Sequence, residues 1–83
     1  MKLDLYYYDQ CPFCQIVLRK IQQLKLEEFI TLKNTLVDSS NRQFHQNTTG
    51  RTTVPCLYID DEPMFESYDI AQWLEDNEDR IRK

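Results

Sequence analysis

Two of the three cysteines in this chain are separated by only two residues, in the stretch Cys11-Pro12-Phe13-Cys14. Thiols at this spacing at the start of a helix can close a disulfide ring, and they are typical of redox-active pairs. The unpaired N–H groups and the positive dipole end of a helix N-terminus favour a thiolate there. We therefore predict that Cys11 attacks a substrate disulfide and that Cys14, one turn into the helix, resolves the mixed disulfide.

The third cysteine and the single histidine are assigned structural roles. A structural zinc ion needs four ligands, and beyond the pair above the chain offers only Cys56 and His45, so no metal site is predicted. Cys56 is expected to be a small buried apolar residue, with a third reactive thiol near the site as the alternative. His45 lies in a polar stretch and is expected at the surface, with a Cys–His pair to Cys11 as the alternative.

A second motif, Thr53-Val54-Pro55, stands where a strand is predicted to begin. Proline is tolerated at the start of a strand, because its missing N–H is not needed there. A cis bond between Val54 and Pro55 would leave the backbone of Val54 free to pair with an extended peptide. The motif alone leaves this open, since an ordinary proline of an edge strand is the alternative.

The elements that position these motifs follow from hydrophobic periodicity. Short or alternating apolar runs predict four strands, at residues 3–8, 29–34, 54–59 and 64–65. Apolar residues at helical spacing and helix start signals predict three helices, at residues 12–24, 38–46 and from 67 onward. The first strand–helix–strand unit favours parallel pairing through a right-handed crossover. The order βαβαββα predicts an α/β fold, with a central four-stranded mixed sheet flanked by helices.

Local signals mark the ends of these elements. Cys11 is expected at the N-cap and Pro12 at the first helical position, where a missing N–H is harmless. Residues 47–50 read as a turn, with the single glycine, Gly50, suited to a left-handed conformation after a helix. A tight turn is expected at residues 60–63, and Ser67 is expected to cap the last helix through its side chain.

Composition limits the class of protein. The chain has 83 residues with 41% hydrophobic content, which fits one domain over residues 1–83, and we expect it to act as a monomer. A net charge of −4 argues against nucleic acid as a partner. No apolar run approaches the ~20 residues that span a bilayer, and Asp4 argues against a signal peptide. Three cysteines do not fit a secreted disulfide scaffold, so a cytoplasmic location is expected.

Together, Cys11-Pro12-Phe13-Cys14, the stretch Gly50–Pro55 (GRTTVP) and Ile59-Asp60 resemble the glutaredoxin family. The resemblance covers nearly the whole chain, and Phe13 replaces the tyrosine of the family's usual CPYC motif. It implies a thioredoxin-like fold, glutathione as reductant with no bound cofactor, and a cis Pro55. It also implies that Cys11 is the nucleophile, that Cys14 resolves, and that the backbone of Val54 pairs with the cysteinyl part of glutathione.

The chain departs from this pattern where glutaredoxins hold the γ-glutamyl end of glutathione. Their usual glycine pair is absent, and the stretch reads Phe65-Glu66-Ser67-Tyr68-Asp69. Glu66-Ser67 is instead similar to the Glu-Ser pair in the N-terminal domains of glutathione transferases. Ser67 and the first N–H groups of the last helix are suited to a carboxylate, and Glu66 to an α-ammonium group. The alternative is a plain N-cap at Ser67 and a surface charge at Glu66.

The glycine end of glutathione has a second departure. Tyr8 stands three residues before Cys11, where the family often has a lysine, and Arg42 or Arg51 is the candidate replacement for that cation. The predicted glutathione-binding residues are Tyr8, Phe13, Thr53, Val54, Pro55, Glu66 and Ser67.

The predicted function is glutathione-dependent reduction of protein disulfides and glutathione mixed disulfides. One alternative uses a thioredoxin reductase in place of glutathione, because the glycine pair and the lysine are missing. Another is a binding module in which Cys11 and glutathione hold an iron–sulfur cluster between two subunits. A stand-alone transferase is disfavoured, since its second substrate needs a helical domain for which 83 residues leave no space.

Overall fold

In the computed structural model, which describes residues 1–83, four strands form one mixed sheet. The strands follow the order β2-β1-β3-β4 across the sheet. β1 pairs in parallel with β2 and antiparallel with β3, and β3 pairs antiparallel with β4. The predicted four-stranded mixed sheet is therefore confirmed. The bounds are β1 Leu3–Tyr7, β2 Thr31–Asn34, β3 Cys56–Ile59 and β4 Glu62–Met64.

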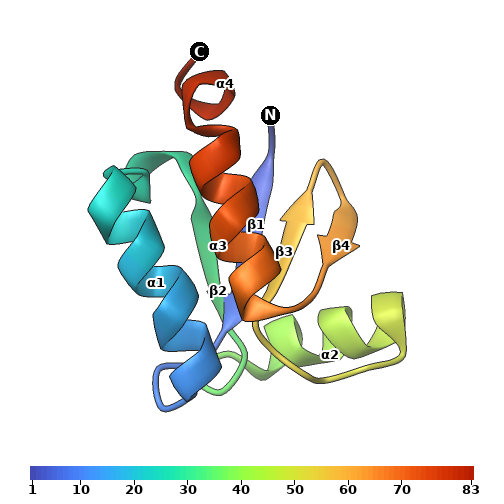
Figure 1. Cartoon of the computed structure of the whole chain (residues 1–83). Coiled ribbons are helices and arrows are strands. Elements are labelled where there is room, and N and C mark those ends of the chain that lie inside the picture. The colour runs from blue at the N-terminus through green and yellow to red at the C-terminus, as the bar shows by residue number, and fades with distance from the viewer.

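Two helices, α1 (Pro12–Leu24) and α3 (Ser67–Asp76), lie side by side against the sheet (Figure 1). A short helix, α4 (Glu78–Arg82), follows α3, and α2 (Ser39–Thr49) crosses near the end of the sheet where β1 leads into α1 (Figure 1). No helix combines the length and the apolar content that a membrane crossing requires.

Alternation along β1 and β3 sorts the core into two clusters. Leu3, Leu5 and Leu57 are buried in the cluster that includes residues of α1 and α3. Tyr6 and Tyr58, which point to the opposite face, are buried against α2. Burial of a leucine of this kind contributes about 1.5–3 kcal/mol relative to an exposed one. The helix residues of the larger cluster are Val17 and Ile21 in α1 and Ile70 and Leu74 in α3.

One boundary in each of β1, β2 and β3 differs from the prediction. β1 ends at Tyr7 rather than Tyr8. β2 begins at Thr31 rather than residue 29, because Glu27–Phe29 forms a 3-10 turn labelled η1. β3 begins at Cys56, one residue after Pro55, because proline has no N–H to donate to the ladder.

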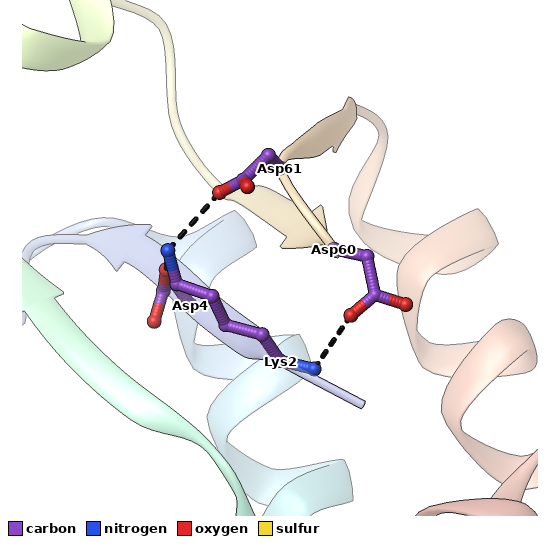
Figure 2. A network of polar contacts seen from close by, with 4 residues as sticks. All are labelled: Lys2, Asp4, Asp60 and Asp61. Carbon is purple, nitrogen blue, oxygen red and sulfur yellow. Dashed lines mark hydrogen bonds and ion pairs between the residues drawn. The ribbon is translucent and has the colours of Figure 1, made fainter.

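The β3–β4 turn is shorter than predicted and is tied to the start of β1. Asp60 and Asp61 both have positive φ, 48° and 73°, as a two-residue hairpin of the primed type requires. The backbone N–H of Lys2 donates to Asp60 Oδ1 at 2.8 Å, and Lys2 Nζ donates to Asp61 Oδ1 at 3.1 Å (Figure 2). Lys2 Nζ also lies 3.8 Å from Asp4 Oδ2. β4 therefore spans Glu62–Met64 instead of residues 64–65.

The helix ends were predicted with mixed success. α1 spans the predicted residues, with Cys11 at the N-cap and Pro12 in the first turn. α2 continues to Thr49, three residues beyond the predicted end, and Gly50 (φ 76°) caps it by donating its N–H to Gln46 O at 2.7 Å. The predicted side-chain cap at Ser67 was wrong. Glu66 occupies the N-cap position of α3, and no side chain caps that helix.

Candidate functional site

The Cys11 thiol lies at the N-cap of α1, where its sulfur accepts the N–H of Cys14 at 3.3 Å. Cys11 has extended backbone angles (φ −84°, ψ 117°), which let an N-cap side chain turn back over the first turn. Pro12 supports this start, because a residue with a fixed φ and no N–H fits the first helical position. Cys11 Sγ thus takes up one N–H group that the helix itself leaves unpaired.

Cys14 has a different environment from Cys11, although both are free thiols. Cys14 is 0% exposed and lines no cavity, whereas Cys11 is 5% exposed and lines a cavity together with Tyr8 and Val54. Burial, together with the contact to Cys11, raises the pKa of Cys14 to about 12. The arrangement leaves Cys11 as the thiol that a substrate meets first, and Cys14 as a protonated thiol held behind it.

The loop before β3 brings a backbone carbonyl to the Cys11 thiol. The peptide bond between Val54 and Pro55 is cis, as the family resemblance implied. Cys11 Sγ donates to Val54 O at 3.9 Å. The thiol and the backbone of Val54 therefore face each other across the entrance to the site.

Two cavities lie on either side of this contact, with volumes of about 150 and 450 Å³. Phe13, Thr53 and Val54 line both of them. Glu66 and Ser67 line the smaller cavity. The structure therefore brings together three segments that are distant in the sequence. Of the other predicted site residues, Pro55 lines the smaller cavity, and Tyr8 and Cys11 line the larger one.

The smaller cavity combines a cation, an anion and a helix N-terminus. The Arg51 guanidinium lies over the Phe65 ring, 4.1 Å from its centroid, and Glu66 lies on the same cavity wall. The first hydrogen bond of α3 runs from Ile70 N to Glu66 O at 2.9 Å, so the N–H groups of residues 67–69 have no partner within the helix. Such a site is suited to a group that carries both a carboxylate and an ammonium.

Glu66 occupies this wall with a strained backbone. Its φ is 75° and its ψ is 112°, in a region that residues other than glycine rarely adopt. Strain of this kind costs about 1–3 kcal/mol, and in proteins it is concentrated at functional sites.

The two arginines proposed as replacements for the missing lysine lie in different cavities. Arg42 lines the larger cavity with Tyr8 and Leu36, and Arg51 lines the smaller one. Arg42 is therefore the candidate cation on the side of Tyr8, the residue that stands where glutaredoxins often have a lysine.

The predicted surface position of His45 was wrong. Its side chain is 0% exposed, with Nε2 2.8 Å from Thr53 O and Nδ1 2.8 Å from the hydroxyl of Tyr58. The polar sequence of α2 hid this burial, because Phe44 is the only large apolar residue in the helix. Cys56 is 0% exposed, which confirms its predicted burial, and burial raises its pKa to about 12.

No group of three or more His, Cys, Asp and Glu side chains lies close enough together to hold a metal ion. The polar groups in contact with Cys11 Sγ are the N–H of Cys14 and the carbonyl oxygen of Val54.

Comparison with known proteins finds matches among glutathione transferases. Residues 5–80 match the family described as "Glutathione S-transferase, N-terminal domain". Similar solved structures include the trimeric glutathione transferase TDR1 of Leishmania, with a TM-score of 0.72 and 31% identity over 93% of this chain. They also include an epsilon-class glutathione S-transferase of the housefly Musca domestica (TM-score 0.74, 23% identity over 92%). A comparison with curated proteins gave no match.

The chain spans 17% of the Leishmania protein and 35% of the housefly protein. The comparisons confirm the predicted thioredoxin-like α/β fold with its four-stranded mixed sheet. They match transferase N-terminal domains and not glutaredoxins in particular, so the narrower resemblance stays a prediction. The expected monomer also stays a prediction.

Proposed function

This chain belongs to the glutathione S-transferase N-terminal domain family, and on that premise we propose that it is a glutathione-dependent thiol–disulfide oxidoreductase. Its substrates are protein disulfides and mixed disulfides of glutathione. The observation that carries the proposal is the pair of thiols at the start of α1, with Cys11 Sγ accepting the N–H of Cys14 and facing Val54 O.

The environment of Cys11 supports its role as nucleophile. Its sulfur lies at a helix N-terminus and accepts an N–H group, and both interactions stabilise negative charge on sulfur. Cys14 is buried and stays protonated, so it does not compete for the first attack. The two thiols differ in burial and in hydrogen bonding, as a nucleophile and a resolving thiol require.

With a glutathione mixed disulfide, the Cys11 thiolate attacks the glutathione sulfur. A disulfide between Cys11 and glutathione forms, and the substrate leaves as a thiolate that takes up a proton. A second glutathione thiolate then attacks the glutathione sulfur on Cys11. Oxidised glutathione leaves, and the Cys11 thiolate is restored. One free glutathione is consumed in total, the other half of the oxidised glutathione comes from the substrate, and the substrate thiol is released in reduced form.

With a protein disulfide, Cys11 forms a mixed disulfide with one substrate sulfur and releases the other as a thiolate. Cys14 gives its proton to the leaving sulfur and attacks the sulfur of Cys11. The substrate departs with both sulfurs reduced, and a disulfide between Cys11 and Cys14 remains. Two glutathione molecules reduce this disulfide and become oxidised glutathione.

The smaller cavity supports glutathione as the reductant. Glu66 offers a carboxylate for the α-ammonium of the γ-glutamyl group, and the start of α3 at Ser67 offers N–H groups for its carboxylate. Val54 lies between this cavity and Cys11, at the place where the cysteinyl backbone of glutathione would pair with it.

The test is reduction of the mixed disulfide of glutathione with a small thiol, coupled through glutathione reductase. We expect turnover by the wild type and none by Cys11→Ser. A parallel assay replaces glutathione and its reductase by thioredoxin reductase. Turnover only in the parallel assay would assign the other reductant, and no turnover in either would refute the proposal.

A second candidate function is conjugation of glutathione to an electrophile, and the family match favours it. In this reaction the sulfur of glutathione, not Cys11, forms the new bond. The assay uses chlorodinitrobenzene, and Cys11→Ser distinguishes the two functions. Conjugation that survives this substitution, with no disulfide reduction by the wild type, would favour the transferase function.

A further inference from the structure

The imidazole of His45 lies behind the loop that carries Thr53 and Val54. It is 0% exposed, and it lines neither of the two cavities beside Cys11. His45 therefore does not meet a substrate in either cavity. The only polar contacts of its ring are Thr53 O and the Tyr58 hydroxyl, each at 2.8 Å.

The two partners determine which ring nitrogen carries the proton. A backbone carbonyl only accepts hydrogen bonds, so Nε2 of His45 donates to Thr53 O. In the neutral ring Nδ1 then accepts from the hydroxyl of Tyr58. The His45 ring thus accepts a hydrogen bond from Tyr58 of β3 at Nδ1 and donates one to Thr53 of the loop at Nε2.

The loop has little else to hold it. Residues 52–55 make two hydrogen bonds within the chain, one from His45 to Thr53 O and one from the Cys11 thiol to Val54 O. The second of these has a length of 3.9 Å and comes from a thiol, which is a weak donor. The bond from His45 is therefore the main polar restraint on the backbone that faces Cys11.

Aromatic rings fix the direction of the His45 donor. The Tyr6 ring stacks on the imidazole, with centroids 5.5 Å apart and an angle of 21° between the planes. The Phe65 ring lies 5.7 Å from the imidazole and carries the Arg51 guanidinium at 4.1 Å from its own centroid. His45 thus contacts both Thr53 and the Phe65 ring. Thr53 and Phe65 both line the smaller cavity.

We infer that His45 is a positioning residue, which holds the Thr53 carbonyl and so sets the backbone of Val54 opposite Cys11. The inference rests on the proposed function for its kinetic consequence, because Val54 is where the disulfide substrate pairs. Loss of the donor would let residues 52–55 move away from Cys11. The binding of substrate would then suffer more than the chemistry of the thiol itself.

The test compares His45→Gln with His45→Asn. The amide nitrogen of glutamine reaches the place of Nε2 and can donate to Thr53 O, whereas the shorter asparagine reaches only the side of Nδ1. With a glutathione mixed disulfide as substrate, we expect His45→Asn to raise KM about tenfold with little change in kcat. His45→Gln is expected to stay within about threefold of the wild-type KM. Tyr58→Phe keeps the bond to Thr53 O and is the matched control.

Equal KM values for the two variants would overturn the inference, and so would a wild-type KM in His45→Asn. Thermal unfolding of all variants shows whether a KM change follows stability instead of the donor. If KM changes only in proportion to the loss of stability, and the His45→Gln and His45→Asn variants do not differ in KM at equal stability, the inference is also overturned.

A readout that needs no turnover separates this inference from the proposed function. The NMR shift of the Thr53 carbonyl carbon and the exchange rate of the Val54 amide report on the loop directly. We expect both to change in His45→Asn and to stay near wild type in His45→Gln. If the wild type reduces no disulfide, the proposed function fails, and these signals still decide the role of His45. Unchanged signals in His45→Asn would refute it.

Discussion

The backbone N–H of Cys14 donates to Cys11 Sγ at 3.3 Å, so the main chain of one cysteine contacts the sulfur of the other. The sequence spacing makes this contact possible, since residues three apart meet at a helix N-cap. The same helix buries the side chain of Cys14 completely. The two cysteines therefore differ in hydrogen bonding and in burial in the free protein.

Iodoacetamide is expected to modify the native protein once near neutral pH, on Cys11. Cys11 lines a cavity, whereas Cys14 and Cys56 are 0% exposed. Burial raises the pKa of both of these thiols to about 12, so they stay protonated and unreactive. Intact mass counts the adducts, and peptide mapping locates them. All three cysteines should react in denaturant, and a native adduct on Cys14 or Cys56 would contradict the assignment.

Cys14→Ser is expected to separate the two substrate classes. Reduction of a glutathione mixed disulfide needs only Cys11, because a second glutathione resolves the intermediate. Turnover of this substrate should therefore stay within about tenfold of wild type. Reduction of a protein disulfide should stop at a mixed disulfide with Cys11, which non-reducing electrophoresis detects as a covalent complex.

Cys56→Ser is the control for the loss of a buried thiol. It should leave both reactions intact, since Cys56 lines neither cavity beside Cys11. Protein disulfide reduction at the wild-type rate by Cys14→Ser would remove Cys14 from the proposed mechanism.

Most of the fold could be predicted because its signals are local. Leu3 and Leu5 alternate along β1, and Pro12 after Cys11 marks the start of α1. The β3–β4 turn was predicted at residues 60–63 but is shorter, because Asp60 and Asp61 take positive φ values without a glycine to mark them. Its length is determined by the tertiary pairing of β3 with β4 and by the contacts of Lys2.

The site could be predicted in its parts but not in its assembly. Cys11, Val54 and Glu66 belong to separate stretches that the sequence singles out, and only the fold brings these stretches together. The contact of Arg51 with Phe65 and the bond from His45 to Thr53 O depend on how α2, the loop and α3 pack together. Hydrophobic periodicity contains no information about such contacts, and the burial of His45 in a polar helix runs against it.

Glu66→Gly is expected to increase the stability of the fold and to weaken the binding of glutathione. Glycine tolerates the φ of 75° that strains Glu66, so the free energy of unfolding should rise by up to about 1 kcal/mol. Loss of the carboxylate should raise the KM for glutathione about tenfold, the effect of one hydrogen bond to a charged group. Urea unfolding and steady-state kinetics measure the two effects.

Glu66→Gln tests the charge without the backbone change and should raise KM by a similar factor with unchanged stability. Glu62→Gln removes an exposed carboxylate in β4, outside both cavities, and is the matched control. A wild-type KM in Glu66→Gln would exclude a role for this carboxylate in binding glutathione.

The stability of the fold is expected to fall between about pH 8.5 and pH 12. A cysteine in an unfolded chain titrates near 8.5, whereas burial raises the pKa of Cys56 to about 12 in the fold. In this window the folded chain binds more protons than the unfolded chain, so the free energy of unfolding decreases as pH rises. The contribution is complete below about pH 8.5, and each such group adds a slope of at most about 1.4 kcal/mol per pH unit.

Cys56→Ala should therefore lose less stability than wild type between about pH 8 and pH 11, as measured by urea unfolding at several pH values. Part of the slope should remain, because burial also raises the pKa values of Cys14 and Tyr58 to about 12. Val17→Ala is the matched control, because it truncates another side chain that is 0% exposed and removes no titrating group. It should lower stability by the same amount at every pH. An unchanged slope in Cys56→Ala would mean that Cys56 titrates alike in the folded and unfolded chains.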